Sequence, residues 1–405
     1  MNLSYFISKR ISKPAANTFS STIYKIGIAS VGISLATMIL SFCILLGFRG
    51  IIEEKIISFG SHLNVTRFTL TSSYLENPIS TGRDIYVNYR QYPFIDHIQT
   101  YSYKPALLKT EEEVLGAFLK GVAPDFNLKR FNANMAEGGF VEFDDSAASN
   151  DVVISKIIAN KLKLKVGDPL IAHFFQNPPR VRRLNVKGIY ETWIEEFDEK
   201  VILVDIKLIQ RLNNWPDSLV GGFEVFIKDF NQLEANEETL YDNIDSDLYV
   251  EKVTDQYQQV FEWLGLIKQN MLIFLVLVLF VASFNMISIV IILIMERTPM
   301  IGMLKAMGAP DKQIRDIFTY NGWKLILWGL LIGNALGIGL GMLQDKFRLI
   351  PLNPENYYMS YVPISWNWPI IIGLNFSVSL LILLVLFIPT AIISRIQPIR
   401  SIRFD

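Results

Sequence analysis

Four long stretches without a charged side chain divide this sequence into very unequal parts. Each reaches the roughly 20 apolar residues that a helix needs to cross the hydrocarbon core of a bilayer. About 220 residues separate the first stretch from the second, whereas the other gaps hold about 20 to 30. The sequence therefore predicts a membrane protein with a large extramembrane domain inserted between its first two spans. The stretches cover 26–48, 271–295, 325–344 and 364–394.

Basic residues are concentrated next to particular ends of these spans. Residues 1–25 hold four Lys and Arg and no acid, 296–324 hold five against three acids, and the tail after Ser394 holds three against one. Such an excess marks the cytoplasmic side of a membrane protein. We therefore expect both termini in the cytoplasm and residues 49–268 outside it. The first span is too long for a cleaved signal peptide and lacks a following A-x-A site, which favours an uncleaved anchor.

We expect the N-terminal segment to be amphipathic. Leu3, Phe6, Ile7 and Ile11 recur at helical spacing, with basic residues on the other face. This pattern favours a helix on the inner leaflet, and a helical extension of the first span is the alternative. The expected division is 1–25 cytoplasmic or interfacial, 26–48 first span, 49–268 outer domain, 269–295 second span, 296–322 cytoplasmic segment, 323–344 third span, 345–366 short outer loop, 367–393 fourth span and 394–405 cytoplasmic tail.

The outer domain shows mostly strand patterns. Ser155–Leu164 has a helical pattern that ends before a turn at 165–169, and Val253–Lys268 is expected to be a helix leading into the second span. Cys43, the single cysteine, lies in the first span, so the outer domain can form no disulfide. The fold class expected is an α+β membrane protein with four transmembrane helices. The expected strands are His62–Leu70, Val114–Gly121, Leu184–Tyr190, Lys200–Val204 and Phe223–Ile227.

Familiar catalytic and cofactor motifs are absent from the sequence. It contains no G-x-x-x-x-G-K-[ST], no H-E-x-x-H and no G-x-S-x-G, and its three histidines are far apart. We expect no catalytic residue, no metal and no cofactor bound by this chain. The net charge of −1 predicts no nucleic-acid partner. Asn285 and Asn334 are the strongest polar groups in the spans, and we expect them to form hydrogen bonds between helices.

The segment between the second and third spans predicts a partner-binding helix. Thr298 can cap a short helix, Pro299 suits its first turn and Gly308 suits the position just past its end. Pro310 and the residue after it restart a helix toward the third span. A short apolar helix joined to two spans fits a groove on a partner, and methionines adapt to such a groove. A loop that merely lies against the bilayer is the alternative.

This segment resembles a known family. Glu296-Arg297-Thr298, Ile301-Gly302, Leu304-Lys305-Ala306 and Gly308-Ala309 resemble the coupling helix of FtsX-like ABC-transporter permeases. The ending 397–405 and the pattern from Val152 to Asp168 are similar to that family as well. The resemblance implies a cytoplasmic ABC ATPase dimer that carries ATP and Mg²⁺, and a second permease chain, identical or different. The coupling contact would then comprise Glu296, Arg297, Met300, Ile301, Leu304, Lys305 and Met307.

Within the family, the sequence most closely resembles the lipoprotein-releasing, or Lol-type, permeases. The likeness lies in Tyr257–Ser288 and in Asn185–Tyr190. It implies a non-catalytic subunit in a bacterial inner membrane that extracts lipoproteins toward the outer membrane, with 49–268 as a periplasmic domain. The partners it implies are membrane lipid, lipoprotein cargo and a periplasmic lipoprotein carrier. The alternatives are an efflux permease for amphiphilic drugs or peptides, and a mechanical scaffold that regulates a cell-wall hydrolase.

Two further sets of residues follow from this resemblance. The loop at 174–180 corresponds to the place of a carrier-gripping hook, although it is short, and a plain strand connection is the alternative. Its candidate contact residues are Phe174, Phe175, Pro178, Pro179 and Arg180. The outer halves of the first two spans would line a cargo path, with lipid contact or helix packing as the alternative for each residue. The candidate path residues are Met38, Phe42, Leu45, Leu46, Phe274, Leu275, Val278 and Leu279.

Overall fold

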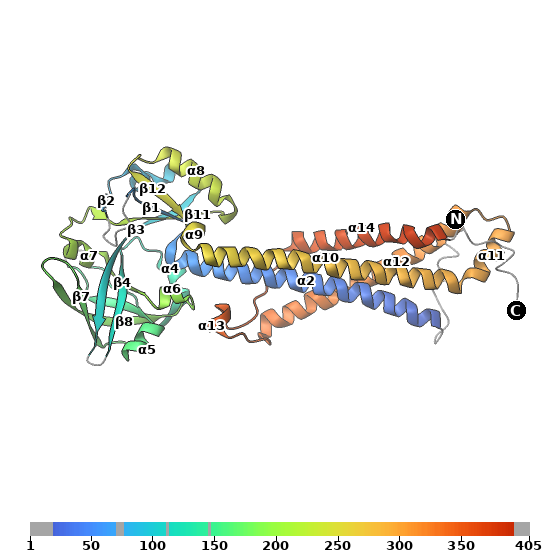
Figure 1. Ribbon diagram of the computed structural model, residues 1–405, viewed down its shortest axis with the longest axis horizontal. Coiled ribbons are helices and arrows are strands. Elements are labelled where there is room, and N and C mark those ends of the chain that lie inside the picture. Colours follow the sequence, from blue (N-terminus) through green and yellow to red (C-terminus); the bar gives the residue numbers. More distant parts are fainter. Residues whose placement is uncertain (1–18, 70–76, 111–112, 145–146, 393–405) are drawn as a thin grey trace. The chain divides into compact units, whose positions relative to one another are not determined.

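The computed structural model describes residues 19–69, 77–110, 113–144 and 147–392. Four helices are long and apolar enough to cross a membrane by length and composition, and they are labelled in Figure 1. The amphipathic helix expected within 1–25 lies almost wholly outside the described residues, as does the tail 394–405. The long helices are α2 (Phe19–Gly60), α10 (Gln258–Glu296), α12 (Asp311–Phe347) and α14 (Trp368–Ile392).

The chain forms two compact units. The helical unit contains α2 up to Gly50, Trp263–Leu352 and the chain from Tyr361 onward. The sheet unit contains Ile51–Glu262 and Asn353–Ser360. The last turns of α2 and a short stretch between α12 and α14 therefore pack with the sheet.

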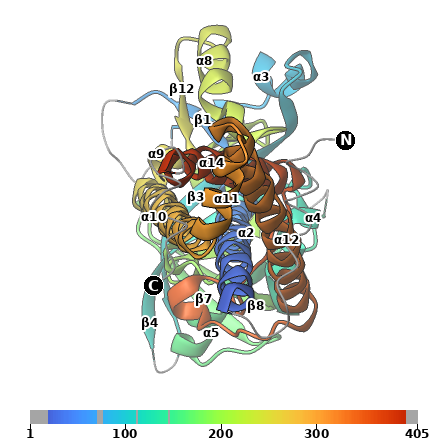
Figure 2. The same cartoon turned by 90° about the vertical axis from the view of Figure 1, so that its right-hand side faces the viewer.

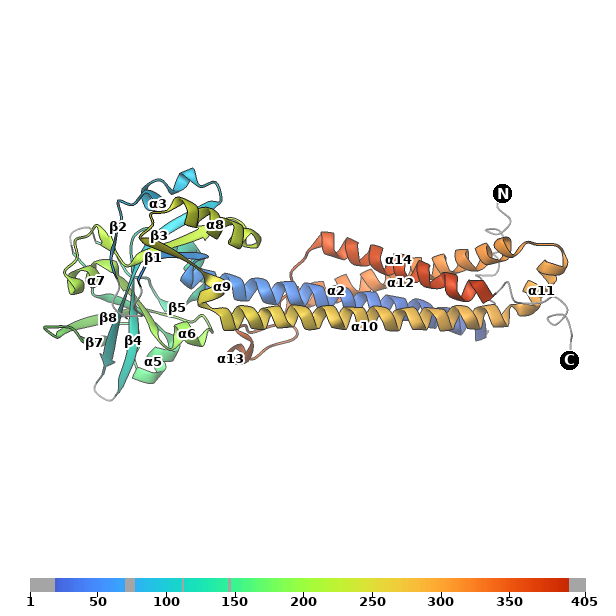
Figure 3. The ribbon, with the colours of Figure 1, turned by 45° about the horizontal axis from the view of Figure 1, so that its top comes forward.

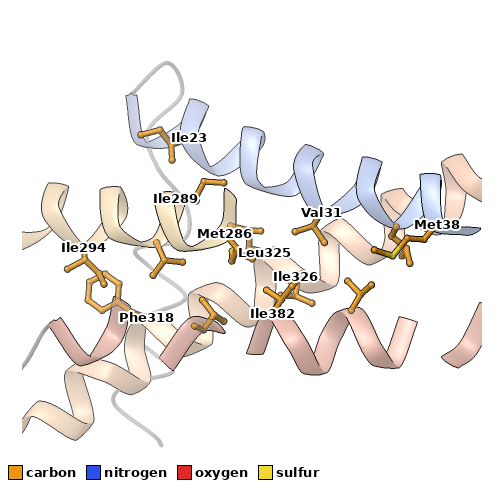
Figure 4. Close-up of a cluster of buried hydrophobic side chains, with 14 of the residues drawn as sticks. Ile23, Val31, Met38, Met286, Ile289, Ile294, Phe318, Leu325, Ile326 and Ile382 are labelled. Carbon is orange, nitrogen blue, oxygen red and sulfur yellow. The ribbon is translucent and has the colours of Figure 1, made fainter. Parts of the chain in front are cut away.

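A continuous apolar core holds the helical unit together (Figure 4). All four long helices contribute to it, and Figure 2 views them nearly end-on. Glycines of α12 let the backbone of α2 approach closely, as small residues do between membrane helices. A Cβ at Gly329 would lie 2.7 Å from Val31 Cγ1, and one at Gly333 would lie 2.8 Å from the Gly32 carbonyl oxygen. Larger residues there would force α2 and α12 apart.

Hydrogen bonds between side chains add specificity to this apolar core. Asn334 and Asn375 exchange two amide hydrogen bonds, with N–O distances of 2.7 and 3.0 Å, which join α12 to α14. Asn285 Nδ2 donates to Ser30 Oγ at 3.0 Å and joins α10 to α2. The expectation that Asn285 and Asn334 bond between helices is confirmed.

The sheet unit is built on one ten-stranded sheet and one two-stranded sheet. The strands are β1 (Leu63–Arg67), β2 (Ile79–Ser80), β3 (Ile95–Lys109), β4 (Val114–Val122), β5 (Met135–Gly138), β6 (Asp151–Ser155), β7 (Pro169–Phe174), β8 (Arg180–Tyr190), β9 (Val201–Asp205), β10 (Leu219–Val220), β11 (Gly222–Ile227) and β12 (Leu248–Lys252). The shorter helices are α3 (Asp84–Val87), α4 (Leu128–Phe131), α5 (Lys156–Leu162), α6 (Glu195–Asp198), α7 (Ile206–Asn213), α8 (Leu233–Asn243), α9 (Val253–Gln256) and α13 (Pro354–Tyr357).

Strand pairing closes on itself in part of this sheet. The main path runs β12-β1-β11-β3-β4-β9-β6-β8-β5, and β7 pairs with both β3 and β8. The six strands from β3 through β4, β9, β6, β8 and β7 therefore form a ring. Alternate residues of these strands, with apolar side chains of α5 and α7, fill its core, as period-two alternation requires. Pairs such as Leu170 with Ala172 and Leu184 with Val186 illustrate this alternation.

A buried ion pair ties the end of α2 to the sheet. Lys120 Nζ on β4 lies 2.6 Å from Glu224 Oε1 on β11, and it also donates to the carbonyl of Phe59 in the last turn of α2. Gln99 Nε2 donates to the other carboxylate oxygen at 2.7 Å. Because both charges are buried, these bonds must replace their lost hydration.

Candidate functional site

The short helix α11 (Thr298–Ala306) connects α10 to α12 (Figure 3). Pro299 lies in its first turn, as expected, and Gly308 adopts a φ of +90° just past its end. Gly308 N–H donates to the Lys305 carbonyl and Ala309 N–H to the Leu304 carbonyl, each at 3.0 Å, which is a Schellman ending. The expected capping role of Thr298 is wrong. Its Oγ1 donates to the Ile294 carbonyl of α10 at 3.2 Å, and Arg297 occupies the cap position.

The two faces of α11 have different environments. Ile301 is 0% exposed, and Met300 and Leu304 pack half-buried against the helical core. On the outer face, Met303 is 60% exposed and Met307 is 70% exposed. The helix therefore presents two flexible apolar side chains to its surroundings while its other face is fixed to the bundle.

An ion pair also fastens α11 to the start of α12. Lys305 Nζ lies 2.9 Å from Asp311 Oδ1, and the Lys305 side chain is only 10% exposed. Together with the packing of Ile301 and Leu304, this contact fixes α11 to the start of α12.

The seven residues expected to form the coupling contact thus separate by environment. Glu296 and Met307 are exposed, Arg297 and Lys305 are partly exposed, and Met300, Ile301 and Leu304 face the core. Met303 was not among them although it is one of the two exposed methionines of this turn. The spacing of four residues between Met303 and Met307 is the signal that identifies a shared face.

The eight residues expected along a cargo path also differ in environment. Phe274 is exposed on α10, whereas the rest are buried in the helical core or half-buried. Hydrophobic spacing cannot distinguish the exposed residues of α10 from its buried ones, because nearly every residue of 271–295 is apolar. The buried members are Met38 and Leu275, and the half-buried ones are Phe42, Leu45, Leu46, Val278 and Leu279.

The 174–180 loop forms the connection between β7 and β8. Phe174 is buried in the ring core, whereas Phe175 is 79% exposed, and Pro178 and Pro179 are exposed beside it. Arg180 donates to the carbonyls of the last turn of α7 and to Asn214 Oδ1 at 2.7 to 3.1 Å. Arg180 therefore anchors the base of the loop, and the tip presents one aromatic ring and two prolines.

Metal-binding clusters are not found in this part of the structure. Within the described ranges, no group of three or more His, Cys, Asp or Glu side chains could hold a metal ion. The candidate site is characterised instead by exposed apolar side chains on α11, on α10 and at the tip of the 174–180 loop.

Comparison with known families identifies this architecture. Residues 272–398, which include α11, match the model of the FtsX-like permease C-terminal region, and residues 27–243 match that of the MacB-like periplasmic core domain. The chain belongs to the FtsX-like permeases. This family is that of ABC-transporter permease subunits, which are generally non-catalytic.

Curated relatives extend over nearly the whole chain. A lipoprotein-releasing system transmembrane protein LolC of Neisseria meningitidis is 22% identical, covering 96% of both chains. A lipoprotein-releasing system transmembrane protein LolE of Haemophilus influenzae is 21% identical and covers 98% of both chains. The recognised likeness to Lol-type permeases is confirmed. Four apolar helices and these relatives fit a multi-pass protein of a bacterial inner membrane.

A solved structure is similar to about half of this chain. The periplasmic region of MacB from Actinobacillus actinomycetemcomitans is 15% identical, with a TM-score of 0.35, covering 51% of this chain and 95% of that region.

Proposed function

We propose that this permease is the membrane subunit of an ABC complex that extracts lipoproteins from the inner membrane. The observation that carries the proposal is the full-length match to relatives named as lipoprotein-releasing transmembrane proteins. In this proposal, two permease chains pair with two ATPase subunits, which bind ATP and Mg²⁺. The chain itself binds neither.

The proposed topology follows from the charge distribution. Both termini and α11 lie in the cytoplasm, where the basic residues are concentrated. The sheet unit, inserted between the first two spans, lies in the periplasm. Met303 and Met307 then face the ATPase, and the rigid link through Lys305 and Asp311 passes its stroke to α12.

The cargo explains the need for ATP. Each buried methylene contributes about 0.8 kcal/mol, so one acyl chain of ~15 methylenes is held in the bilayer by roughly 12 kcal/mol. A groove that binds passively cannot release two or three such chains toward water. We infer that closure of the ATPase moves the helices and that the periplasmic domain displaces the cargo toward a carrier. Phe175 and the neighbouring prolines are the proposed contact with that carrier.

Reconstitution tests the proposal. The chain is purified with its associated subunits, which are identified by mass, and placed in proteoliposomes loaded with a triacylated lipoprotein. The expected result is ATP-dependent release of lipoprotein to a soluble acceptor. Release of an amphiphilic drug or peptide without release of lipoprotein would instead support the second candidate, an efflux permease. The match of 27–243 to a MacB-like core domain keeps that candidate open. Association with a hydrolase and no transport would support the scaffold function.

A further inference from the structure

The sheet unit contains a junction where the last turns of α2 meet the segment that joins α12 to α14. Lys55 Nζ, on α2, donates to the carbonyl of Thr192 and to the carbonyl of Tyr358, each at 2.8 Å. Thr192 precedes α6, and Tyr358 follows α13. One half-buried ammonium group therefore holds together three segments that are far apart in the sequence.

The loop that receives Lys55 is built around Asp198. The Asp198 carboxylate accepts from Thr192 N–H and Oγ1 and from Trp193 N–H, at 2.7 to 3.1 Å. The Asp198 carbonyl accepts from Ser155 Oγ, at the end of β6. Thr192 and Asp198 are almost fully buried. The 192–198 loop is thus fixed to the sheet and offers a rigid support.

Aromatic packing fastens the same loop to α2 and to the approach to α10. The ring of Phe59 stacks on Phe197 with centroids 4.2 Å apart, and Phe197 meets Tyr257 edge-on at 5.2 Å. Tyr257 is the residue between α9 and α10. Lys55 supplies a polar anchor for segment 353–360 through the carbonyl of Tyr358.

Backbone conformation indicates that the junction is held under constraint. Trp193 has a φ of +66° and Tyr358 a φ of +60°, a region that bulky residues rarely adopt. Such residues persist where their surroundings fix them, and they concentrate at functional places. Each lies at or directly beside a carbonyl that accepts from Lys55.

We propose that Lys55 is a positioning residue for transport, which fastens the α12–α14 connection to the 192–198 loop so that this connection and the end of α2 move with the sheet as one body. The inference rests on the proposed function, because it assigns the tether to the stroke that displaces cargo. Without the tether, movement of α12 would be absorbed by segment 353–360 instead of reaching the sheet.

The test compares Lys55→Met and Lys55→Arg with Lys161→Met in the full complex. Lys161, on α5, pairs with Glu199 just after α6 at 2.9 Å, and both side chains are exposed, so Lys161→Met matches the loss of one charge nearby. Amide hydrogen exchange is followed at Asn356, Tyr357 and Tyr358, whose N–H groups bond within the segment. ATP hydrolysis and lipoprotein release are measured on the same preparations.

For Lys55→Met we expect exchange in 353–360 to rise about tenfold or more, because a charge-assisted hydrogen bond is lost, while β4 and β9 stay protected. ATP hydrolysis should persist and lipoprotein released per ATP should fall. Lys55→Arg should restore part of the exchange protection of 353–360 and part of the lipoprotein release per ATP, whereas Lys161→Met should change neither quantity. Unchanged exchange in 353–360, or unchanged release per ATP, would overturn the proposal. If the wild-type complex releases no lipoprotein, the proposed function fails, and the exchange data still decide the tether.

Discussion

Among single residues, His62 makes the stability of the sheet unit depend on pH. His62 is buried, and its Nδ1 accepts from the Ile227 N–H at 3.2 Å, which requires a neutral ring. Burial, with a further contribution from the charge of Arg130, lowers the pKa of His62 from 6.5 to about 4. Between about pH 4 and pH 6.5, His62 therefore carries a proton in the unfolded chain that it does not carry in the folded chain. The free energy of unfolding should be highest above pH 6.5 and fall by up to about 3 kcal/mol toward pH 4.

Unfolding of the purified chain in detergent, followed between pH 7 and pH 5, checks this expectation. His62→Gln keeps an acceptor for Ile227 without a titrating group, so its unfolding should depend less on pH than that of the wild type. His173→Gln, at a half-buried position on β7, is the matched control. Equal pH dependence in the wild type and His62→Gln would contradict the role of His62.

A second residue-scale prediction concerns the amide pair of α12 and α14. Replacing Asn334 by Leu leaves Asn375 without its interhelical partner, and we expect a loss of roughly 1 kcal/mol in stability. The double variant with Asn375→Leu should cost less than the sum of the two single changes. Unfolding of the four proteins in mixed detergent measures this coupling. Strictly additive changes would show that the two amides do not stabilise each other.

Among the elements, α11 gives a test of ATPase coupling. Met303→Asp or Met307→Asp places a charge on the exposed face, and an unpaired carboxylate at a closed contact costs several kcal/mol. We expect each variant to insert normally, lose the ATPase in a pull-down and stop transport. Met303→Leu should retain both. Ile301→Asp should instead destabilise the bundle, because Ile301 is fully buried, and Leu304→Asp should combine both defects. Normal ATPase recovery with both methionine variants would reject α11 as the contact.

The elements also show where sequence patterns reach their limit. Strands β4, β8, β9 and β11 lie where short β-rich runs bounded by turn residues predict them, and Ser155 caps α5 by accepting from Ile158 N–H at 3.0 Å. The longest strand, β3, was not predicted, since Pro105 lies within it and prolines are rare inside sheets. The helix expected over 253–268 is interrupted at Tyr257, where the backbone leaves the helical region. Local pattern cannot reveal that the ring of Tyr257 packs edge-on against Phe197 at this break.

Residue spacing in the sequence predicts part of the candidate site. The position of α11 follows from Pro299 and Gly308, whose backbone requirements are local. The sequence does not show which side of α11 faces the core, because the helix is apolar on most sides. For this reason the expected coupling contact includes both the buried Ile301 and the exposed Met307. The junction around Lys55 leaves no motif in the sequence, because Lys55, Thr192 and Tyr358 meet through tertiary contacts.

For the whole molecule, the proposed extraction of lipoproteins requires that acyl chains meet an apolar surface that is open to lipid. Phe274 is 42% exposed on α10, whereas Met38 is 2% exposed in the helical core. A photo-crosslinker at Phe274 should therefore capture a lipoprotein before ATP is added and lose it afterward. The same probe at Met38 should capture none, which serves as the matched control. Val278→Asp, at the edge of this surface, should leave ATP hydrolysis intact and retain lipoproteins in the membrane, because a charge repels acyl chains and draws in water. Capture at Phe274 that does not respond to ATP would mean that this face of α10 contacts bulk lipid and not the cargo path.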